Sequence, residues 1–132
     1  MKTRGLPPEK ARIYEEKSRR YEAAARSAHG EGNWDPAVSA AVHAVINAVD
    51  AVCIASLGER AAADDHEAAV ELLLKVPTLA AEKRTQAAKH FKALLALKHA
   101  AEYEDRLCDE KEAKRALQSL ERALGALREG RA

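Results

Sequence analysis

Three polar side chains within one short stretch of the sequence could do chemistry: Asp50, Arg60 and His66. Histidine transfers protons near neutral pH, and arginine binds phosphate oxygens through two parallel N–H bonds. Five residues separate Arg60 from His66, so a junction between two helices can place the two side chains next to each other. The pattern predicts a site that binds a phosphate group and moves a proton, with Asp50 close by on the preceding helix.

The helix that carries Asp50 is predicted to lie at the centre of the fold. Asp50 is the only Asp, Glu, Lys or Arg between positions 36 and 56. Apolar residues therefore cover more than the arc of an ordinary amphipathic helix, which indicates burial on most sides. Its polar residues follow at spacings of four, four and three and form one row: Ser39, His43, Asn47 and Asp50. This row is also compatible with a solvent face or a subunit contact.

The remaining elements are predicted to be helices as well. Ala, Leu, Glu, Lys and Arg dominate the chain, and no strand-like alternation bounded by turns is present. Helices are predicted from Pro7–Pro8 to about His29, from Asp35–Pro36 to about Leu57, from Asp64 to about Val76, from about Thr78 to about Leu107, and from Asp109 to the residues before a frayed tail at Gly130. We predict an all-α protein, an up-and-down bundle of about five helices. Residues 1–132 form a single domain with an ordered core at about 9–129.

Residues at the expected helix ends support these boundaries. The predicted caps are Asp35 with Pro36 at the start of the second helix, Gly58 at its end, a capping box of Asp64 and Glu67, and a second box of Asp109 and Glu112. A carboxylate at the N-cap accepts hydrogen bonds from free backbone N–H groups, and glycine adopts the left-handed conformation that ends a helix.

The fourth predicted helix changes from apolar to charged along one face. Lys98 and Glu102 continue the stripe that Phe91 and Leu95 begin. Because charges on a packed face need partners, Asp50 and Lys98 are predicted to pair with each other. A pair between Lys98 and Glu102, four residues apart on one helix, is the alternative interpretation.

Composition limits the classes of function. The 132 residues hold 22 basic and 21 acidic side chains, a net charge of +1, so no general field attracts nucleic acid or membrane and any RNA contact must be local. Cys53 and Cys108 form no Cys-x-x-Cys pair. No secretory segment and no long uncharged apolar run is evident. We therefore expect a protein of the cytoplasm that does not associate with membranes.

Several kinds of active site are absent from the sequence. There is no Glu-x-x-His element for a di-metal bundle, no His-Glu-x-x-His zinc motif and no glycine-rich phosphate loop. A Gly-x-Ser-x-Gly nucleophile motif is also missing. The histidines show no ligand spacing with one another. The sequence thus predicts neither a metal ion nor a cofactor.

Three segments together resemble a known superfamily. They are Ala-Val-His-Ala-Val-Ile-Asn-Ala-Val-Asp-Ala on the central helix, Gly-Glu-Arg-x5-His at the following junction, and Leu-Leu-Ala-Leu-Lys-His-Ala-Ala-Glu-Tyr-Glu on the fourth helix. This combination resembles HEPN domains (higher eukaryotes and prokaryotes nucleotide-binding), and the likeness in helix order covers roughly residues 9 to 127. Many such domains are dimeric helical bundles, so the resemblance implies a homodimer.

The resemblance also implies a reaction. A large subset of these domains are metal-independent ribonucleases of toxin or defence systems with an Arg-x4-6-His motif, which Arg60 and His66 match. In that reaction the 2′-hydroxyl of RNA attacks the adjacent phosphate and leaves a cyclic phosphate. His66 would move the proton and Arg60 would hold the phosphate. Asp50, Lys98 and Glu102 are predicted as supporting residues, and so is Asp65.

The same resemblance leaves a second function open. Ala61 follows Arg60 where active members usually carry a polar residue, and Ala68 stands where toxin members often carry tyrosine. Other members lack activity and bind partners such as nucleotidyltransferases. The alternative is therefore a non-catalytic interaction module, in which Arg60 pairs with a nearby aspartate and His66 is an ordinary first-turn residue.

Overall fold

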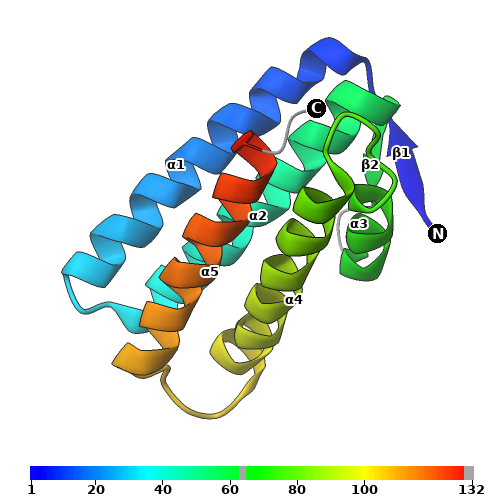
Figure 1. Cartoon of the computed structure of the whole chain (residues 1–132). Coiled ribbons are helices and arrows are strands. Elements are labelled where there is room, and N and C mark those ends of the chain that lie inside the picture. Colours follow the sequence, from blue (N-terminus) through cyan, green and yellow to red (C-terminus); the bar gives the residue numbers. More distant parts are fainter. Residues whose placement is uncertain (63–64, 130–132) are drawn as a thin grey trace.

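Five helices form the body of the computed structural model, which describes residues 1–62 and 65–129. They are α1 (Ala11–Gly30), which follows a 3-10 turn η1 (Pro8–Lys10), α2 (Trp34–Leu57), α3 (His66–Leu73), α4 (Ala81–Tyr103) and α5 (Glu110–Glu129). Figure 1 shows α5 between α1 and α4, with the central helix α2 behind them and the short α3 near one end of α4. With 77% of residues in helices, the expected all-α bundle is confirmed.

Helix α2 packs against all four other helices, which explains its apolar composition. Val38, Val42, Val45 and Val49 have no solvent exposure. By length and composition, α2 is also the one helix in the described residues that would be able to cross a membrane, but 61% of its most apolar window is buried inside the bundle. The prediction that this is the central helix is confirmed.

The start of α2 differs from the prediction. The helix begins at Trp34 with Asn33 as its N-cap, and Asp35 does not cap it. The Asp35 carboxylate instead accepts two hydrogen bonds from the backbone N–H of Cys108, at 3.1 and 3.3 Å. Its charge still lies in the first helical turn, where the helix dipole favours it. Asp35 therefore attaches the segment before α5 to α2.

The end of α2 is as predicted. Gly58 follows the last helical residue with a positive φ of 69°, and its N–H donates to the carbonyl of Ile54 at 3.0 Å. Glycine reaches this left-handed conformation without the strain that a Cβ atom brings. The turn at Gly58 directs the chain into the segment that carries Arg60.

A two-stranded ribbon follows Gly58, which the sequence did not predict. Strand β1 (Thr3–Gly5) pairs antiparallel with β2 (Glu59–Ala61), with Arg4 opposite Arg60. Leu6 N–H donates to the Gly58 carbonyl at 2.9 Å, and Ala62 N–H donates to the Lys2 carbonyl at 3.0 Å. Strands of three residues are too short to show alternation. The ribbon fixes the backbone on both sides of Arg60.

Helix α3 is shorter than predicted and has a different N-cap. Asp65 is the N-cap, and its carboxylate accepts from Ala68 N–H at 2.9 Å. The N-cap had been assigned one residue too early, to Asp64, which lies outside the described residues. The helix ends at Leu73, before the predicted Val76. Neighbouring aspartates offer the same capping chemistry, so their order in the chain cannot be decided from composition.

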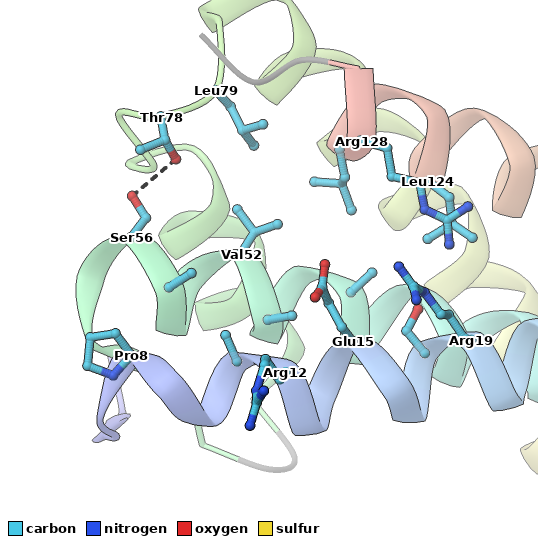
Figure 2. A pocket seen from close by; sticks show the side chains of 16 residues that line it. Pro8, Arg12, Glu15, Arg19, Val52, Ser56, Thr78, Leu79, Leu124 and Arg128 are labelled. Atoms are coloured by element: carbon cyan, nitrogen blue, oxygen red, sulfur yellow. Dashed lines mark hydrogen bonds between the residues drawn. The ribbon is translucent and has the colours of Figure 1, made fainter.

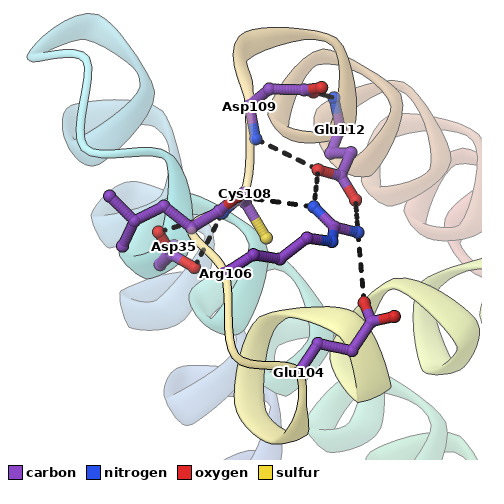
Figure 3. Close-up of polar contacts among 7 residues, drawn as sticks. Asp35, Glu104, Arg106, Cys108, Asp109 and Glu112 are labelled. Atoms are coloured by element: carbon purple, nitrogen blue, oxygen red, sulfur yellow. Dashed lines mark hydrogen bonds and ion pairs between the residues drawn. The ribbon is translucent and has the colours of Figure 1, made fainter.

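The predicted capping box at the start of α5 is confirmed. Glu112 N–H donates to Asp109 at 2.8 Å, and Asp109 N–H donates to Glu112 at 3.1 Å. Arg106 adds two hydrogen bonds of 2.8 Å to both oxygens of Glu112, as Figure 3 shows. This cluster closes the loop after α4, which ends at Tyr103 and not at the predicted Leu107.

Candidate functional site

Arg60 lies at a corner where β2 meets α1 and α2. Its Nη1 atom is 3.9 Å from Oδ2 of Asp50 and donates to the carbonyl of Ala61 at 3.1 Å. The guanidinium carbon lies 5.5 Å from the centre of the Tyr14 ring on α1, within the range of a cation–π contact. Only 14% of the Arg60 side chain is exposed. The guanidinium is thus held by an aromatic ring, a carboxylate and a carbonyl.

One donor of this guanidinium is unused. Arg60 Nε is buried and has no hydrogen-bond partner among the described residues. A buried donor without an acceptor costs free energy, and such groups are rare outside functional or strained sites. The contact with Asp50 is also long for a charge-assisted hydrogen bond, which is normally below 3 Å. Arg60 therefore keeps capacity to bind a further acceptor.

Asp50 is the acidic member of the corner and is 6% exposed. Burial raises the pKa of the Asp50 carboxyl to about 7, and the positive charge of Arg60 lowers it by a smaller amount. At neutral pH this carboxyl is therefore present in both protonated and ionised forms. Nearby on α2, burial first and the Asp50 charge second raise the pKa of the Cys53 thiol to about 12. Cys53 is consequently a thiol and not a nucleophile at neutral pH.

His66 is the first residue of α3 and is half-buried. A short connection links it to β2, in which Asp65 N–H donates to the Ala62 carbonyl at 2.9 Å. The five residues between Arg60 and His66 thus connect a strand to a helix. Arg60 contacts Tyr14 of α1 and Asp50 of α2, while His66 is the first residue of α3.

The supporting residues divide into two groups. Asp50 lies in the corner, and Asp65 has a structural task as the N-cap of α3. Lys98 pairs with Glu102 at 3.1 Å, and its Nζ atom lies 5.6 Å from the Tyr103 ring centre. The predicted pair of Asp50 with Lys98 is therefore wrong, since the ion pair of Asp50 is with Arg60. Lys98 and Glu102 satisfy each other on α4, as the alternative interpretation expected.

The polar row on α2 makes mainly local contacts before it reaches Asp50. The His43 ring packs on Tyr21 with centres 5.2 Å apart, and Asn47 donates to the carbonyl of His43 at 2.8 Å. These side chains face α1 or their own helix. Within the row, Asp50 alone belongs to the corner.

Tyr14 is the member of the corner that sequence reasoning missed. In the sequence it is one of several residues on one stripe of the amphipathic first helix. Its role depends on packing between segments that are far apart in the chain, and Lys17 lies 5.3 Å from the same ring on its own helix. The position of a tyrosine on one face of an amphipathic helix does not indicate that an arginine from another element will contact its ring.

The described residues contain no cluster of three or more His, Cys, Asp or Glu side chains that would hold a metal ion. The corner itself supplies a guanidinium for an anionic oxygen and a carboxyl that titrates near neutral pH. His66, at the start of α3, is the imidazole of the same chain segment that can move a proton. Comparisons of the chain with protein-family models, curated proteins and solved structures found no match.

Proposed function

We propose that the protein is a HEPN-like endoribonuclease that cleaves RNA without a metal ion, with Arg60 and Asp50 of the corner and with His66 at the start of α3. The observation that carries the proposal is the buried Arg60 guanidinium, which has an unused Nε–H beside a carboxyl with a pKa of about 7. A phosphate oxygen supplies the missing acceptor, and two N–H bonds from one guanidinium fit a phosphodiester. The resemblance to HEPN domains assigns the same pair, Arg60 and His66.

The reaction proposed for this corner is an internal transfer of the phosphoryl group. The 2′-oxygen of RNA forms a bond to phosphorus, the bond from phosphorus to the 5′-oxygen breaks, and a cyclic phosphate remains. His66 takes the proton from the 2′-hydroxyl and returns it to the leaving 5′-oxygen. Arg60 stabilises the charge on the non-bridging oxygens. Asp50 is a positioning residue that holds Arg60 and releases it when the carboxyl binds a proton.

We further propose that the active form is a homodimer in the cytoplasm, of the toxin or defence type. The net charge of +1 gives a single chain little long-range attraction for RNA. Two copies of the corner next to each other would concentrate the positive charge of the two Arg60 side chains. RNA is the proposed substrate, and no cofactor takes part.

The proposal is tested with a labelled single-stranded RNA in buffer that contains EDTA. His66→Ala and Arg60→Lys are each expected to lower the cleavage rate about 100-fold or more, because one loses the proton carrier and the other loses paired N–H donors. Lysine keeps the charge beside Asp50, so the fold is retained. The wild-type product should carry a 2′,3′-cyclic phosphate and a free 5′-hydroxyl.

Arg4→Ala is the matched control, since Arg4 faces Arg60 across the ribbon and is exposed. It should keep most of the cleavage activity. Circular dichroism and size-exclusion chromatography check that helicity and the oligomeric state are the same in all variants. Undiminished cleavage in both His66→Ala and Arg60→Lys would falsify the assignment.

A non-catalytic interaction module is the second candidate, and the low exposure of Arg60 favours it. At 14% exposure the guanidinium is largely covered by Asp50 and Tyr14. The apolar neighbours Ala61 and Ala68 also lack the polar groups of active family members. In this case the wild-type protein cleaves no RNA and forms a stoichiometric complex with a partner, such as a nucleotidyltransferase, in size-exclusion chromatography.

A further inference from the structure

A groove of about 860 Å³ lies beside α2, and none of Asp50, Arg60 and His66 lines it. Its walls are the first half of α1 and the last turns of α5, and its floor is the second half of α2. The segment between α3 and α4 closes one end through Thr78 and Leu79, and Thr78 donates to Ser56 at 3.3 Å. Arg12, Glu15 and Arg19 of α1 and Arg128 of α5 line this space. Figure 2 shows Glu15 pointing from α1 into it, while the Arg12 side chain extends toward the outer side of α1.

The groove exists because α1 and α5 separate along α2. Two ion pairs hold the two helices together at one end: Arg128 with Glu22 and Arg26 with Glu121, each at 3.1 Å. Beyond Arg128 the described part of α5 ends at Glu129, whereas α1 continues for more than two turns toward Ala11. That end of α1 therefore has no helical neighbour on its α5 side within the described residues.

The floor of the groove is made of small or apolar side chains. Ala48, Ala51, Val52 and Ala55 follow one face of α2 at helical spacing, and Ala55 is exposed. Small side chains let another helix approach closely, because interaxial distance depends on the residues at the contact. The lining reaches from Pro8 to Arg19 along α1, which corresponds to about 16 Å or three turns of helix.

The rim is positively charged and partly unpaired. Arg12 and Arg19 make no ion pair with any of the described residues. They are seven residues apart on one face of α1, about 10 Å along the helix. Arg128 adds a third guanidinium and Glu15, which has an interaction partner, adds one carboxylate. A ligand of this groove should therefore carry acidic groups at its edges and apolar groups at its centre.

We propose that this groove docks an acidic amphipathic helix of a partner protein. Its apolar residues would pack on Val52 and Ala55, and carboxylates about two turns apart would pair with Arg12 and Arg19. A small amphiphile fits less well, because the groove is only partly enclosed. Pockets for small ligands bury about 70–90% of the ligand surface. None of Asp50, Arg60 and His66 lines the groove, so the proposal is independent of the ribonuclease.

The test uses the whole chain and a fluorescein-labelled synthetic peptide of about four helical turns, with leucines on one face and glutamates on both flanks. Fluorescence anisotropy measures its affinity. Ala55→Trp fills the groove at an exposed position, and the double variant Arg12→Glu/Arg19→Glu reverses the rim charge. We expect the first to prevent binding and the second to weaken it about tenfold or more.

The matched control is the double variant Arg20→Glu/Arg122→Glu. These arginines are exposed on the same two helices but do not line the groove, so peptide affinity should stay within about twofold of wild type. A second peptide with glutamine in place of every glutamate should bind about tenfold more weakly. Amide chemical-shift changes on peptide addition should centre on Ala48, Val52 and Ala55.

Three results overturn the proposal. They are no saturable binding of the acidic peptide, unchanged binding by Ala55→Trp, and equal affinity for the glutamate and glutamine peptides. Dodecanoate is the third ligand to be tested, after the two peptides. If it binds in the groove while the peptide does not, the site belongs to a small amphiphile and the helix proposal is wrong.

Discussion

Two pairs of arginine and carboxylate in this protein are built in opposite ways. At the loop before α5, Arg106 makes two hydrogen bonds of 2.8 Å to Glu112, whose pKa these bonds lower to about 2. At the corner, Arg60 reaches Asp50 through one contact of 3.9 Å, and burial raises the pKa of Asp50 to about 7. In the first pair the ionised carboxylate is stabilised, whereas in the second the ionised carboxylate is destabilised by burial.

The difference separates a structural pair from a candidate functional one. Glu112 has a bidentate arginine and the N–H of Asp109, so its capacity to accept hydrogen bonds is largely used inside the protein. Arg60 has a buried Nε–H with no acceptor among the described residues. A buried charge with incomplete pairing costs stability and is retained where function requires it. Such a corner can accept a ligand without first losing an optimal interaction.

The largest effect is expected from Arg60→Ala. Removal of the guanidinium leaves the Asp50 carboxylate buried without its counter-ion, which costs about 3–5 kcal/mol when the charge must be kept. At pH 8 the carboxyl is ionised and most of this cost applies. At pH 5.5 Asp50 holds a proton, since its pKa is about 7 even with Arg60 present, and the cost is smaller. Urea unfolding at the two pH values measures the difference.

The sign of the underlying pH dependence follows from the same shift. The pKa of Asp50 rises from 3.8 in the unfolded chain to about 7 in the fold, so unfolding releases a proton between these values. This group therefore lowers stability as pH rises from about 4 to about 7. Arg60→Ala/Asp50→Asn removes both charges and should recover much of the stability at pH 8. If Arg60→Ala loses the same stability at pH 8 and at pH 5.5, Asp50 is not a buried carboxyl that titrates between these values.

The opposite pH dependence is expected at the loop, with a smaller effect. Glu112→Ala removes the capping box and the bidentate pair, for a loss of about 2 kcal/mol at pH 7. The pKa of Glu112 is lowered from 4.5 to about 2, so its contribution is present above pH 4.5 and is lost as pH falls toward 2. Urea unfolding at pH 7 and at pH 3 tests this. If Glu112→Ala loses as much unfolding free energy at pH 3 as at pH 7, the pH dependence of the loop is not opposite to that of the corner.

Glu110→Ala is the control for the loop. Glu110 is an exposed acid in the same first turn of α5 and interacts with the helix dipole. Its replacement should cost about 0.5 kcal/mol, which is the part of the Glu112 effect that any first-turn acid contributes. The remainder measures the capping box together with Arg106.

The same two regions show how far the sequence can be interpreted. The box of Asp109 and Glu112 was predicted because both partners are three residues apart, and local spacing decides such contacts. The central helix and the stop at Gly58 were also predicted, since they depend on composition and one special residue. In these cases the signal lies within one helix or at its end.

The corner required information that spacing does not contain. Arg60 could reach Asp50 or a nearby aspartate, and Asp50 was assigned to Lys98 because both were candidate buried charges. The short pairing of β1 with β2 turns Arg60 toward α1 and α2, and three-residue strands leave no pattern. Tyr14 enters from α1 for the same reason. Local spacing predicted that Arg60 and His66 share a junction, but tertiary packing decides which way each side chain points.

The smallest effect concerns the glycine that leads into the corner. Gly58→Ala adds a Cβ whose nearest contact is an ordinary 3.8 Å to the carbonyl oxygen of Leu6, so only the left-handed backbone opposes it. The expected loss is about 1 kcal/mol by urea unfolding. Gly125→Ala is the matched control, because a Cβ at this site in α5 meets no atom within 4 Å. It should gain about 0.5–1 kcal/mol from the helix preference of alanine. If Gly58→Ala is as stable as wild type, the turn at residue 58 does not constrain β2, and the position of Arg60 must be fixed by its contacts with Asp50 and Tyr14 alone.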